Sequence, residues 1–484
     1  MGLQKATISG LIWTLAQQFS VQIIYFITQI ILARLLSPSA FGLIAMLQIF
    51  ISIGQILIDN GMATSLIRTQ NVDERDYSTV FIINMVSSVL IYMIIFILAP
   101  FIASFYNLSE LTLIVRVYTL SFIIQALVGV QTTQLTKAMN FKLQMLMQVP
   151  SAIIGGISGI ILAIMGYGVW SLVWMALIRT FVFMVQHWFY TDWRPKLMFD
   201  KLKLKYHFGF GYKLTLSGVL DVIYTNSYNL IIGKLFSTTQ LGYYNQADTL
   251  RMFPVNNISM ALNKVTYPMF ASINNDDEKL KIAYKKLMTQ ILFWIVPFML
   301  LLIVIARPLF IFLIGEKWEP AVPYFRILCI AAIVYPLHIY NLNIINVKGR
   351  SDLFLRLEVI KKIVGLSVIG ISLFFGMPGL LIGQVLFSFG AVYINTYYSG
   401  KMINYSLKEQ MKDIYPIFLI AVFTLVITWG GYLILGNYFR LANLLQVVLV
   451  GTVFFATYIG VCFLYKVPAL QDFKNIVSNK PLLP

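Results

Sequence analysis

The chain contains about fourteen apolar stretches, and each is long enough to cross a lipid bilayer as an α-helix. A helical span needs about 20 mostly apolar residues, because its backbone N–H and C=O groups must find partners within the segment when water is absent. The strands of a transmembrane barrel would instead alternate in polarity over about 10 residues. The continuous apolar runs therefore predict an all-α membrane protein with about 14 transmembrane helices.

The predicted spans follow one another along nearly the whole chain. Pro254 and Pro336 interrupt two of them and leave the count open by about one or two. The spans are 8–33, 41–65, 78–103, 111–135, 147–166, 168–190, 208–233, 242–270, 286–313, 321–346, 354–375, 378–399, 413–436 and 442–465.

The composition also excludes a soluble protein, since 59% of the residues are hydrophobic and only 11% are charged. A soluble domain carries roughly 25% charged residues, so this chain would lack the polar surface to cover itself in water. The first apolar run is longer than the core of a cleavable signal peptide, and no small-residue cleavage site follows it. It is therefore expected to remain as the first membrane helix.

The loops between the spans differ strongly in basic charge. If the N-terminus is cytoplasmic, the cytoplasmic segments hold roughly three times as many Lys and Arg residues as the opposite segments. The positive-inside rule then predicts that both termini lie in the cytoplasm. Most of the formal net charge of +17 thus lies beside the membrane, where anionic lipid head groups are the expected contacts and no nucleic acid is a predicted partner.

The chain also repeats itself. The segment Ile31–Gly42 reappears as Ile231–Gly242, with a basic residue, a serine and a glycine in register. Because span 7 crosses the membrane in the same direction as span 1, spans 1–6 and 7–12 are predicted to be parallel repeats around a central cavity. Further pairs recur in order at a slightly larger offset: Pro100 and Pro308, Arg116 and Arg326, Val149 and Val359, Gly155 and Gly365, and Gly166 and Gly376.

This repeat divides the chain into an N-terminal lobe (1–205), a C-terminal lobe (206–405) and an appended pair of helices, spans 13 and 14 (406–484). The basic stretch 190–207 is predicted to link the two lobes, and no loop is long enough to hold a catalytic domain. Two similar membrane halves favour a transporter that alternates between two states.

Polar side chains form a stripe on one face of the first span, where Gln18, Gln22, Tyr25 and Gln29 recur at helical spacing. Span 7 carries a stripe at nearly the same spacing, and spans 2, 6 and 8 add further polar residues. These residues are Asp59, Asn60, Arg179, Lys213, Ser217, Asp221, Tyr224, Tyr228, Arg251, Asn256, Asn257, Asn263 and Lys264.

Charge within a membrane usually faces a cavity or a partner, so the stripes predict a hydrophilic cavity lined by spans 1, 2, 7 and 8. Cationic groups there suit a phosphate or pyrophosphate, which Arg binds with two hydrogen bonds. Asp59 and Asp221 are predicted to hold these cations or to exchange a proton or Na⁺. The predicted substrate-binding residues are Lys213, Arg251, Lys264, Gln18, Gln22, Gln29, Asn256 and Asn257.

A structural interpretation of the same residues remains open. The amides could join helices by hydrogen bonds, and lysines near span ends could extend to the lipid head groups. The three histidines are scattered and the two cysteines lie within spans, so no metal site, cofactor or catalytic residue is predicted. A membrane enzyme would need a large catalytic loop or a buried His–Asp pair, and neither is visible in the sequence, so the chain is predicted not to be an enzyme.

Several segments resemble one known family. Ile31–Gly42 is similar to the first loop of Wzx-type polysaccharide flippases, and Asp59–Ile67 resembles the end of their second helix. Leu241–Ala247 is similar to the opening of their eighth helix, and Val265–Phe270 resembles its close. The resemblance covers essentially the whole chain and is nearest to the colanic-acid-exporter-like branch of the multidrug/oligosaccharidyl-lipid/polysaccharide exporter superfamily.

The resemblance implies two six-helix lobes around a central cavity, with two additional C-terminal helices. It implies a flippase that moves undecaprenyl-pyrophosphate-linked oligosaccharides across the bacterial inner membrane for surface polysaccharide assembly, by alternating access. Membrane lipids, a polysaccharide polymerase and a chain-length regulator are the expected partners. The alternative on the same scaffold is an ion-coupled exporter of drugs or of lipid II.

Overall fold

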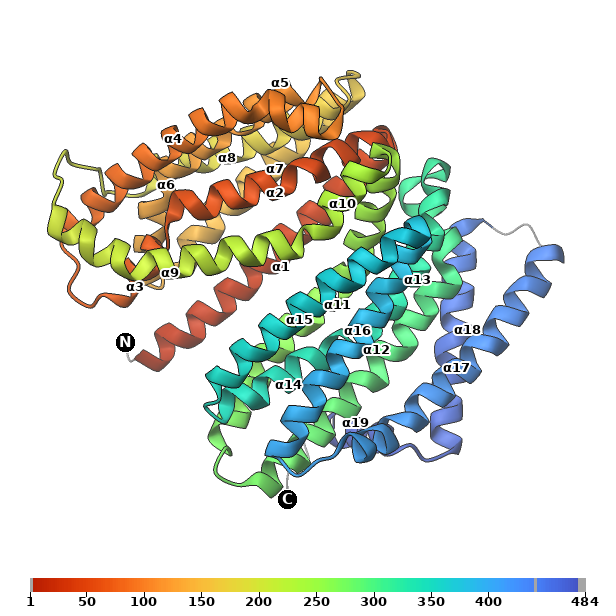
Figure 1. Ribbon diagram of the computed structural model, residues 1–484. Coiled ribbons are helices and arrows are strands. Elements are labelled where there is room, and N and C mark those ends of the chain that lie inside the picture. The colour runs from red at the N-terminus through yellow and green to blue at the C-terminus, as the bar shows by residue number, and fades with distance from the viewer. Residues whose placement is uncertain (1–2, 439–441, 478–484) are drawn as a thin grey trace. The chain divides into compact units, whose positions relative to one another are not determined.

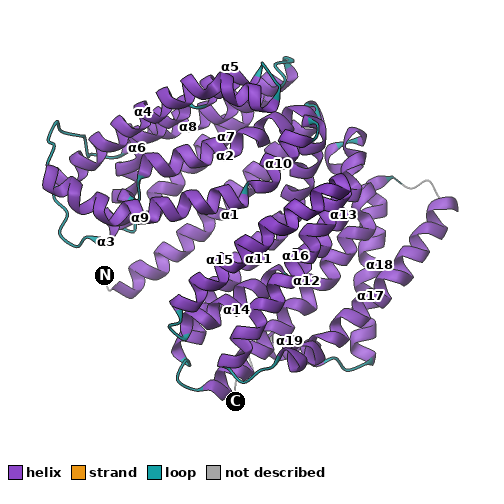
Figure 2. Cartoon of the chain, viewed as in Figure 1, coloured by secondary structure: helices purple, strands orange, loops and turns teal. Residues whose placement is uncertain are grey.

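The computed structural model describes residues 3–438 and 442–477, and within this range it leaves undescribed the side chains of 3–9, 11, 260–265, 434–438 and 474–477. The described secondary structure consists of α-helices and two short 3₁₀ segments, with no strand in these ranges (Figure 2). The predicted all-α class is therefore confirmed.

The helices of the first part of the chain lie where the apolar spans predict them, with short connections between them. They are α1 (Leu3–Leu35), α2 (Pro38–Asp59), α3 (Met62–Arg68), α4 (Glu74–Tyr106), α5 (Leu111–Tyr118), α6 (Leu120–Lys137), α7 (Phe141–Ile164), α8 (Val169–Tyr190), α9 (Lys201–Thr225) and α10 (Ser227–Leu235).

The second part of the chain continues in the same way. Its helices are α11 (Thr238–Ser272), α12 (Asp277–Ile314), α13 (Val322–Ile333), α14 (Tyr335–Val347), α15 (Ser351–Ser372), α16 (Gly376–Met402), α17 (Leu407–Tyr438), α18 (Asn443–Leu464) and α19 (Pro468–Val477), and its 3₁₀ segments are η1 (Glu316–Ala321) and η2 (Leu373–Phe375).

Eleven segments of the described residues are long and apolar enough to cross a membrane. One of them, Ser351–Met402, is 52 residues long and contains both α15 and α16. The α9–α10 pair and α11 are long as well, but they are more polar than the other spans and are outside this set. Together these helices agree with the predicted number of about fourteen.

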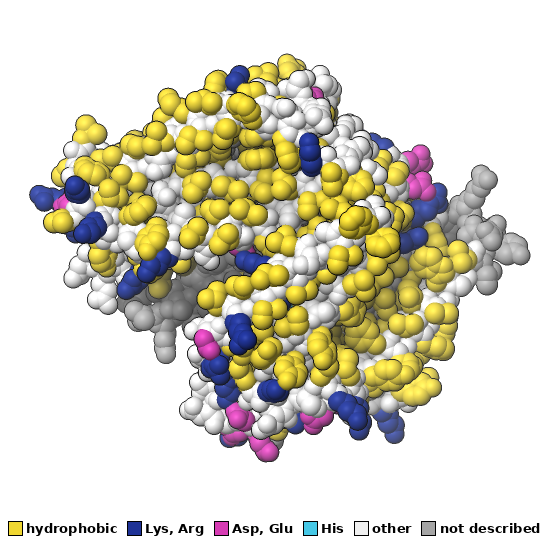
Figure 3. Space-filling view, in the orientation of Figure 1, with side chains coloured by type: hydrophobic (Ala, Val, Ile, Leu, Met, Phe, Trp, Pro, Cys, Tyr) yellow, Lys and Arg dark blue, Asp and Glu magenta, His cyan; other side chains and the backbone are white. Residues whose placement is uncertain are grey.

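The outer surface of the helices is apolar. Ile97, Phe101 and Ile164 are each more than 65% exposed, which is unfavourable in water and expected in lipid. Figure 3 shows hydrophobic side chains over most of the visible face, with most charged side chains near helix ends. The chain is a multi-pass membrane protein.

Contacts divide the chain into two compact units, Met1–Gly242 and Tyr243–Pro484. In the first unit α7 packs between α1 and α8 (Figure 1). Glycines make this close packing possible, because an added Cβ at Gly156 would lie 2.6 Å from Oγ1 of Thr28 on α1. A Cβ at Gly155 would lie 2.6 Å from Cβ of Arg179 on α8.

In the second unit α12 is the central helix, and α13, α17 and α18 pack against it. Most of its side chains are buried, including Phe293 and Phe310. The hydroxyl of Tyr458 on α18 donates a hydrogen bond to the carbonyl oxygen of Phe293 at 3.0 Å. The helices predicted as spans 13 and 14 thus pack on α12.

The structure confirms the repeat at the level of single contacts. In the first unit Arg116 Nε donates to the carbonyl oxygen of Phe96 at 3.2 Å, and in the second unit Arg326 Nε donates to that of Ile303 at 3.1 Å. Gly166 and Gly376 both lie in the turn between two helices of their repeat, Gly166 after α7 and Gly376 directly after η2, and both have positive φ, 85° and 65°. Equivalent residues therefore make equivalent local structure in both halves.

The duplicated loop motif also packs on its own copy. Both copies lie between two helices, since α1 ends and α2 begins around Ser37 as α10 ends and α11 begins around Ser237. An added Cβ at Gly42 would lie 1.9 Å from the carbonyl oxygen of Thr238, and one at Gly242 would lie 1.9 Å from that of Pro38. This reciprocal contact explains why glycine occupies both positions.

Two local predictions need correction. The predicted linker 190–207 is shorter, because α9 begins at Lys201, where Asp200 accepts hydrogen bonds from the first free N–H groups of the helix. The predicted span 111–135 agrees with the candidate membrane span Leu111–Lys137, in which a turn at Thr119 separates α5 from α6. The helix α19 was not predicted, because its amphipathic sequence is too short and polar to span a membrane.

The boundary between the units also differs from the boundary of the repeat. By sequence, α9 corresponds to α1, yet α9 and α10 fall within the first unit. There α9 packs on α2, α3 and α4. At one crossing, an added Cβ at Gly211 would lie 2.0 Å from the carbonyl oxygen of Asn60.

We predict that Gly211→Ala destabilises the protein by about 1–3 kcal/mol, because the new methyl group forces α9 away from the α2–α3 turn. The matched control is Gly209→Ala in the same helix, where an added Cβ has no atom within 4 Å. This control should be neutral or stabilising by up to about 1 kcal/mol. Thermal unfolding in detergent measures both, and equal melting temperatures would contradict the packing argument.

Candidate functional site

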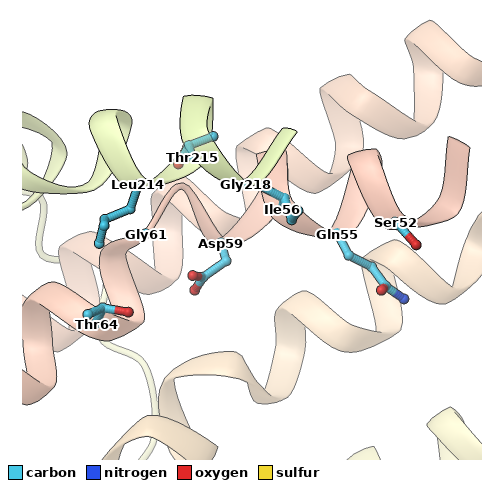
Figure 4. Close-up of a pocket in the computed structure, with 9 residues that line it drawn as sticks. All are labelled: Ser52, Gln55, Ile56, Asp59, Gly61, Thr64, Leu214, Thr215 and Gly218. Atoms are coloured by element: carbon cyan, nitrogen blue, oxygen red, sulfur yellow. The ribbon is translucent and has the colours of Figure 1, made fainter. Parts of the chain in front are cut away.

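A cavity of about 430 Å³, lined by polar and apolar side chains, lies in the first unit where α2, α3 and α9 meet (Figure 4). Two segments far apart in the sequence build it, because α9 lies across the end of α2. The lining residues are Ser52, Gln55, Ile56, Asp59, Gly61, Thr64, Leu214, Thr215 and Gly218. Of the residues predicted to bind substrate or tune its charge, Asp59 lines this cavity.

The turn between α2 and α3 determines where Asp59 stands. Asn60 and Gly61 both have positive φ, 48° and 64°, so the chain turns sharply after the last residue of α2. The Ala63 N–H donates to Oδ1 of Asp59 at 3.4 Å. Figure 4 shows the Asp59 carboxylate beside Thr64 and Gln55, which lie on the same side of the two helices.

The α9 side of the cavity depends on a second small residue. An added Cβ at Gly218 would lie 3.3 Å from Cδ1 of Ile56, so glycine lets α9 lie close to α2. Thr215 is buried and bonds the carbonyl oxygen of Gly211. A carboxylate, an amide and hydroxyl groups around one cavity can accept hydrogen bonds from sugar hydroxyls or hold a cation.

The polar stripe on α1 is present as predicted. Gln18 is exposed, whereas Gln22 and Gln29 are half-buried. Gln29 hydrogen-bonds the side chain of Tyr25, and Arg179 of α8 interacts electrostatically with Tyr25. The neighbouring Gln17 donates to Oε1 of Gln148 on α7. One amide beside the stripe thus joins two helices, as the structural interpretation expects.

Lys213 and Asp221 lie on α9, and both side chains are exposed. Lys213 Nζ lies 5.9 Å from the centre of the Tyr212 ring. Lys213 lies two residues before Thr215 and five before Gly218, so helix geometry turns its side chain by roughly 140–200° from these cavity residues. Its ammonium group is an exposed cation of α9.

Arg251 is held differently from the prediction. It is buried in the second unit, where its Nε and Nη2 both bond Oδ1 of Asp248, at 2.8 and 2.5 Å. Its Nη1 donates to the carbonyl oxygen of Leu328 at 3.2 Å. The predicted cation thus has a carboxylate partner that the sequence analysis overlooked, although a spacing of three residues is typical of such helix pairs.

The remaining predicted residues lie on α11. Asn256 is exposed, and Asn257 donates to the carbonyl oxygen of Phe253 at 2.7 Å. The side chain of Lys264 lies outside the described part of the structure. Asp59 and Lys213 belong to the first unit and Arg251 to the second, so a cavity shared by all of them stays a prediction.

Sequence reasoning missed one polar cluster. His207 Nε2 and Asp76 Oδ1 lie 3.0 Å apart, and His207 Nδ1 lies 2.8 Å from Oγ of Ser65. The conclusion that the chain has no buried His–Asp pair was therefore wrong. No local pattern could reveal it, because the two residues are 131 positions apart and meet only through the packing of α9 on α4.

Comparison with known proteins decides the family. The polysaccharide biosynthesis protein family matches residues 31–323, a range that includes the whole cavity and Arg251. The chain belongs to this family.

Relatives of the chain are named for the synthesis of different surface polymers. A lipopolysaccharide biosynthesis protein, WzxC, from Escherichia coli is 23% identical over 89% of this chain and 88% of its own length. A teichuronic acid biosynthesis protein, TuaB, from Bacillus subtilis is 24% identical over 72% of this chain and 73% of its own length. An uncharacterised membrane protein in a cps region of Klebsiella pneumoniae is 25% identical over 80% of each chain.

Two solved structures have a fold similar to that of this chain. A lipid II flippase, MurJ, in an inward closed conformation matches with a TM-score of 0.73 at 14% identity, over 94% of this chain and 99% of that chain. An inward-facing multidrug resistance MATE transporter matches with a TM-score of 0.62 at 18% identity, over 79% and 94%. The fold is therefore that of membrane transporters.

We predict that Arg251→Ala lowers the free energy of unfolding by about 3 kcal/mol, because it leaves the Asp248 carboxylate without its cation. This value is at the low end of the range for a buried pair, since the Asp248 side chain is 35% exposed. Lys213→Ala should stay within about 0.5 kcal/mol of wild type. Chemical or thermal unfolding measures both, and equal losses would contradict the contrast between a paired and an exposed cation.

Proposed function

We propose that this protein is a flippase that moves undecaprenyl-pyrophosphate-linked oligosaccharides across the bacterial inner membrane by alternating access. The observation that carries the proposal is that a polysaccharide biosynthesis family matches the part of the chain that contains the polar cavity. A lipid-linked sugar has a polar head and an apolar tail. A polar cavity among lipid-exposed helices suits both parts of such a molecule.

The proposed roles follow from side-chain chemistry. Lys213 offers an exposed cation on α9, the helix that forms one wall of the cavity, and Lys264 is proposed to add a second cation. The amides of Gln18, Gln22 and Gln29 suit sugar hydroxyls, and so do those of Asn256 and Asn257.

Arg251 is proposed to bind the pyrophosphate in competition with Asp248. A bidentate arginine–phosphate pair is stronger than an ordinary hydrogen bond, and the carboxylate keeps the arginine charge compensated until the substrate arrives. Asp59 in the cavity and Asp221 on α9 are proposed to tune the charge or to couple the cycle to an ion. Arg251 is thus proposed to be bound to Asp248 when no substrate is present, and to exchange this partner for the pyrophosphate during the transport cycle.

Polysaccharide substrates are favoured over drugs or lipid II. Two relatives that match 72–89% of this chain in sequence are named for the biosynthesis of lipopolysaccharide and teichuronic acid. The lipid II flippase and the multidrug transporter resemble the chain in fold, at 14% and 18% identity. A polymerase and a chain-length regulator are the proposed partners, since a translocated repeat unit must be joined into a polymer.

We predict that deletion of the gene traps lipid-linked oligosaccharide on the cytoplasmic leaflet, because the head group has no other polar route through the bilayer. Wild type should restore export, and Lys213→Ala should restore it poorly, since the exposed cation is lost. Lys205→Ala removes another exposed lysine of α9 outside the proposed site and should restore export. Lipid-extract analysis of both leaflets is the measurement.

Two outcomes would contradict this proposal. Normal translocation in the deletion strain, with no redundant transporter, would exclude the flippase function. Equal export by Lys213→Ala and Lys205→Ala would exclude Lys213 as a head-group ligand.

The proposed orientation has both termini in the cytoplasm. We predict that a membrane-impermeant maleimide labels Asn107→Cys, but not Gln70→Cys, in intact spheroplasts. Both positions are exposed in loops of the first unit, and the native Cys329 and Cys462 are buried. Labelling of Gln70→Cys from outside would reverse the orientation.

A further inference from the structure

Three polar side chains meet in a nearly dry site between α3, α4 and α9, at the end of the first unit where α9 begins (Figure 1). Ser65, Asp76 and His207 are 2%, 2% and 0% exposed. His207 bonds both of the other residues, through Nδ1 to Ser65 Oγ at 2.8 Å and through Nε2 to Asp76 Oδ1 at 3.0 Å. Buried polar groups arranged this way fasten the three helices together.

The carboxylate of Asp76 accepts hydrogen bonds from several donors. Its Oδ2 accepts from Lys203 Nζ and from the Asp73 N–H, both at 2.9 Å. The hydrogen bond to Asp76 raises the pKa of Lys203, and the Asp76 N–H lowers the pKa of Asp73. These two groups therefore keep their charges at neutral pH.

Histidine is the side-chain type of this cluster that commonly binds and releases a proton in proteins. With Nε2 donating to Asp76, a neutral ring leaves Nδ1 to accept from the Ser65 hydroxyl. A protonated ring donates from Nδ1 to the same oxygen, because a hydroxyl can both donate and accept. One proton can thus be bound at Nδ1 without breaking either contact.

A proton on His207 balances the charge of this cluster. Asp73, Asp76 and Lys203 together carry one net negative charge, and a protonated His207 neutralises it. The other charged groups nearby are engaged elsewhere: Glu74 with Lys196, Arg68 over the Phe210 ring, Lys137 on the Leu66 carbonyl oxygen, and Asp200 on the first N–H groups of α9.

The cluster lies on the same helix as the polar cavity. His207 is one turn before Gly211, where α9 crosses the α2–α3 turn, and Leu214, Thr215 and Gly218 of α9 then line the cavity. A hydrophobic cluster that includes Met62, Leu66 and Leu204 packs alongside. The contacts that fix the start of α9 therefore also fix the position of one wall of the cavity.

We propose that Ser65, His207 and Asp76 form a proton-binding site that fastens the Lys201–Gly211 segment of α9 to α3 and α4. Loss of the proton converts the Asp76–His207 ion pair to a hydrogen bond between the Asp76 carboxylate and a neutral ring. It leaves one negative charge of the cluster uncompensated and loosens this wall of the cavity. The link from this movement to transport rests on the proposed function.

A hydrolytic triad does not fit the same geometry. The Ser65 hydroxyl is almost completely buried. Its neighbour Thr64 lines the cavity and Ser65 does not. A nucleophile needs a substrate carbonyl within reach, so the cluster is assigned to proton binding.

The test is hydrogen–deuterium exchange of the purified full-length protein in lipid nanodiscs at pH 6 and pH 8.5, corrected for the intrinsic pH dependence of exchange. In the wild type, protection of 201–211 should fall at least about fivefold at the higher pH, because local opening becomes easier. In His207→Gln, protection should be the same at both pH values, because an amide bonds Asp76 but does not titrate.

The matched control is His187→Gln in the same unit. His187 is also fully buried, and its ring nitrogens lie 3.2 Å from Thr132 Oγ1 and 2.9 Å from the Phe183 carbonyl oxygen, with no carboxylate bonded to it among the described residues. This variant should keep the wild-type pH response of 201–211. Equal protection of the wild-type segment at both pH values would overturn the proposal, and so would a full response in His207→Gln.

If His207→Gln does not fold, the comparison of two segments of the wild-type protein still tests the proposal. A pH response confined to 201–211 and absent from the α8 segment around His187 supports the site, and an equal response in both segments overturns it. Because exchange needs no substrate, its outcome is independent of the oligosaccharide assay, so failure of the proton site and failure of the flippase function are told apart.

Discussion

The bilayer supplies no hydrogen-bond partners, and the structure depends on this constraint throughout. Backbone groups are satisfied within helices, and arginines of the spans find acceptors in their own unit. Arg116 and Arg326 each bond a carbonyl oxygen on a neighbouring helix, and Arg251 bonds Asp248 and a carbonyl oxygen. Each of these three guanidinium groups is therefore held by acceptors close to it in the fold.

Glycine has the complementary role, since it sets how closely the helices approach. The reciprocal contact of Gly42 and Gly242 joins the two copies of the loop motif, and Gly211 brings α9 against the α2–α3 turn. Small residues thus place α9, a helix of the second repeat, within the first unit. The cavity around Asp59 and the cluster around His207 both follow from that placement.

Much of the fold could be predicted from the sequence, because apolar length and the repeat are local or periodic signals. The Asp248–Arg251 pair was also within reach, since residues three apart on a helix are neighbours. The turn at Thr119 between α5 and α6 could not be predicted, because no proline or glycine lies next to it in the sequence. The contact of His207 with Asp76 had no sequence signal, because α9 and α4 are joined by packing and not by spacing.

By itself, the sequence determined that the chain forms about fourteen membrane helices, their approximate positions and their arrangement in two similar halves. Bilayer thickness and backbone hydrogen bonding act on each segment separately, so they leave a readable pattern. Only the tertiary structure decided which polar residues meet, because those pairs depend on which helix faces pack together. Asp59 with the α9 wall, Arg251 with Leu328, and His207 with Ser65 and Asp76 all depend on helix–helix contacts between distant parts of the chain.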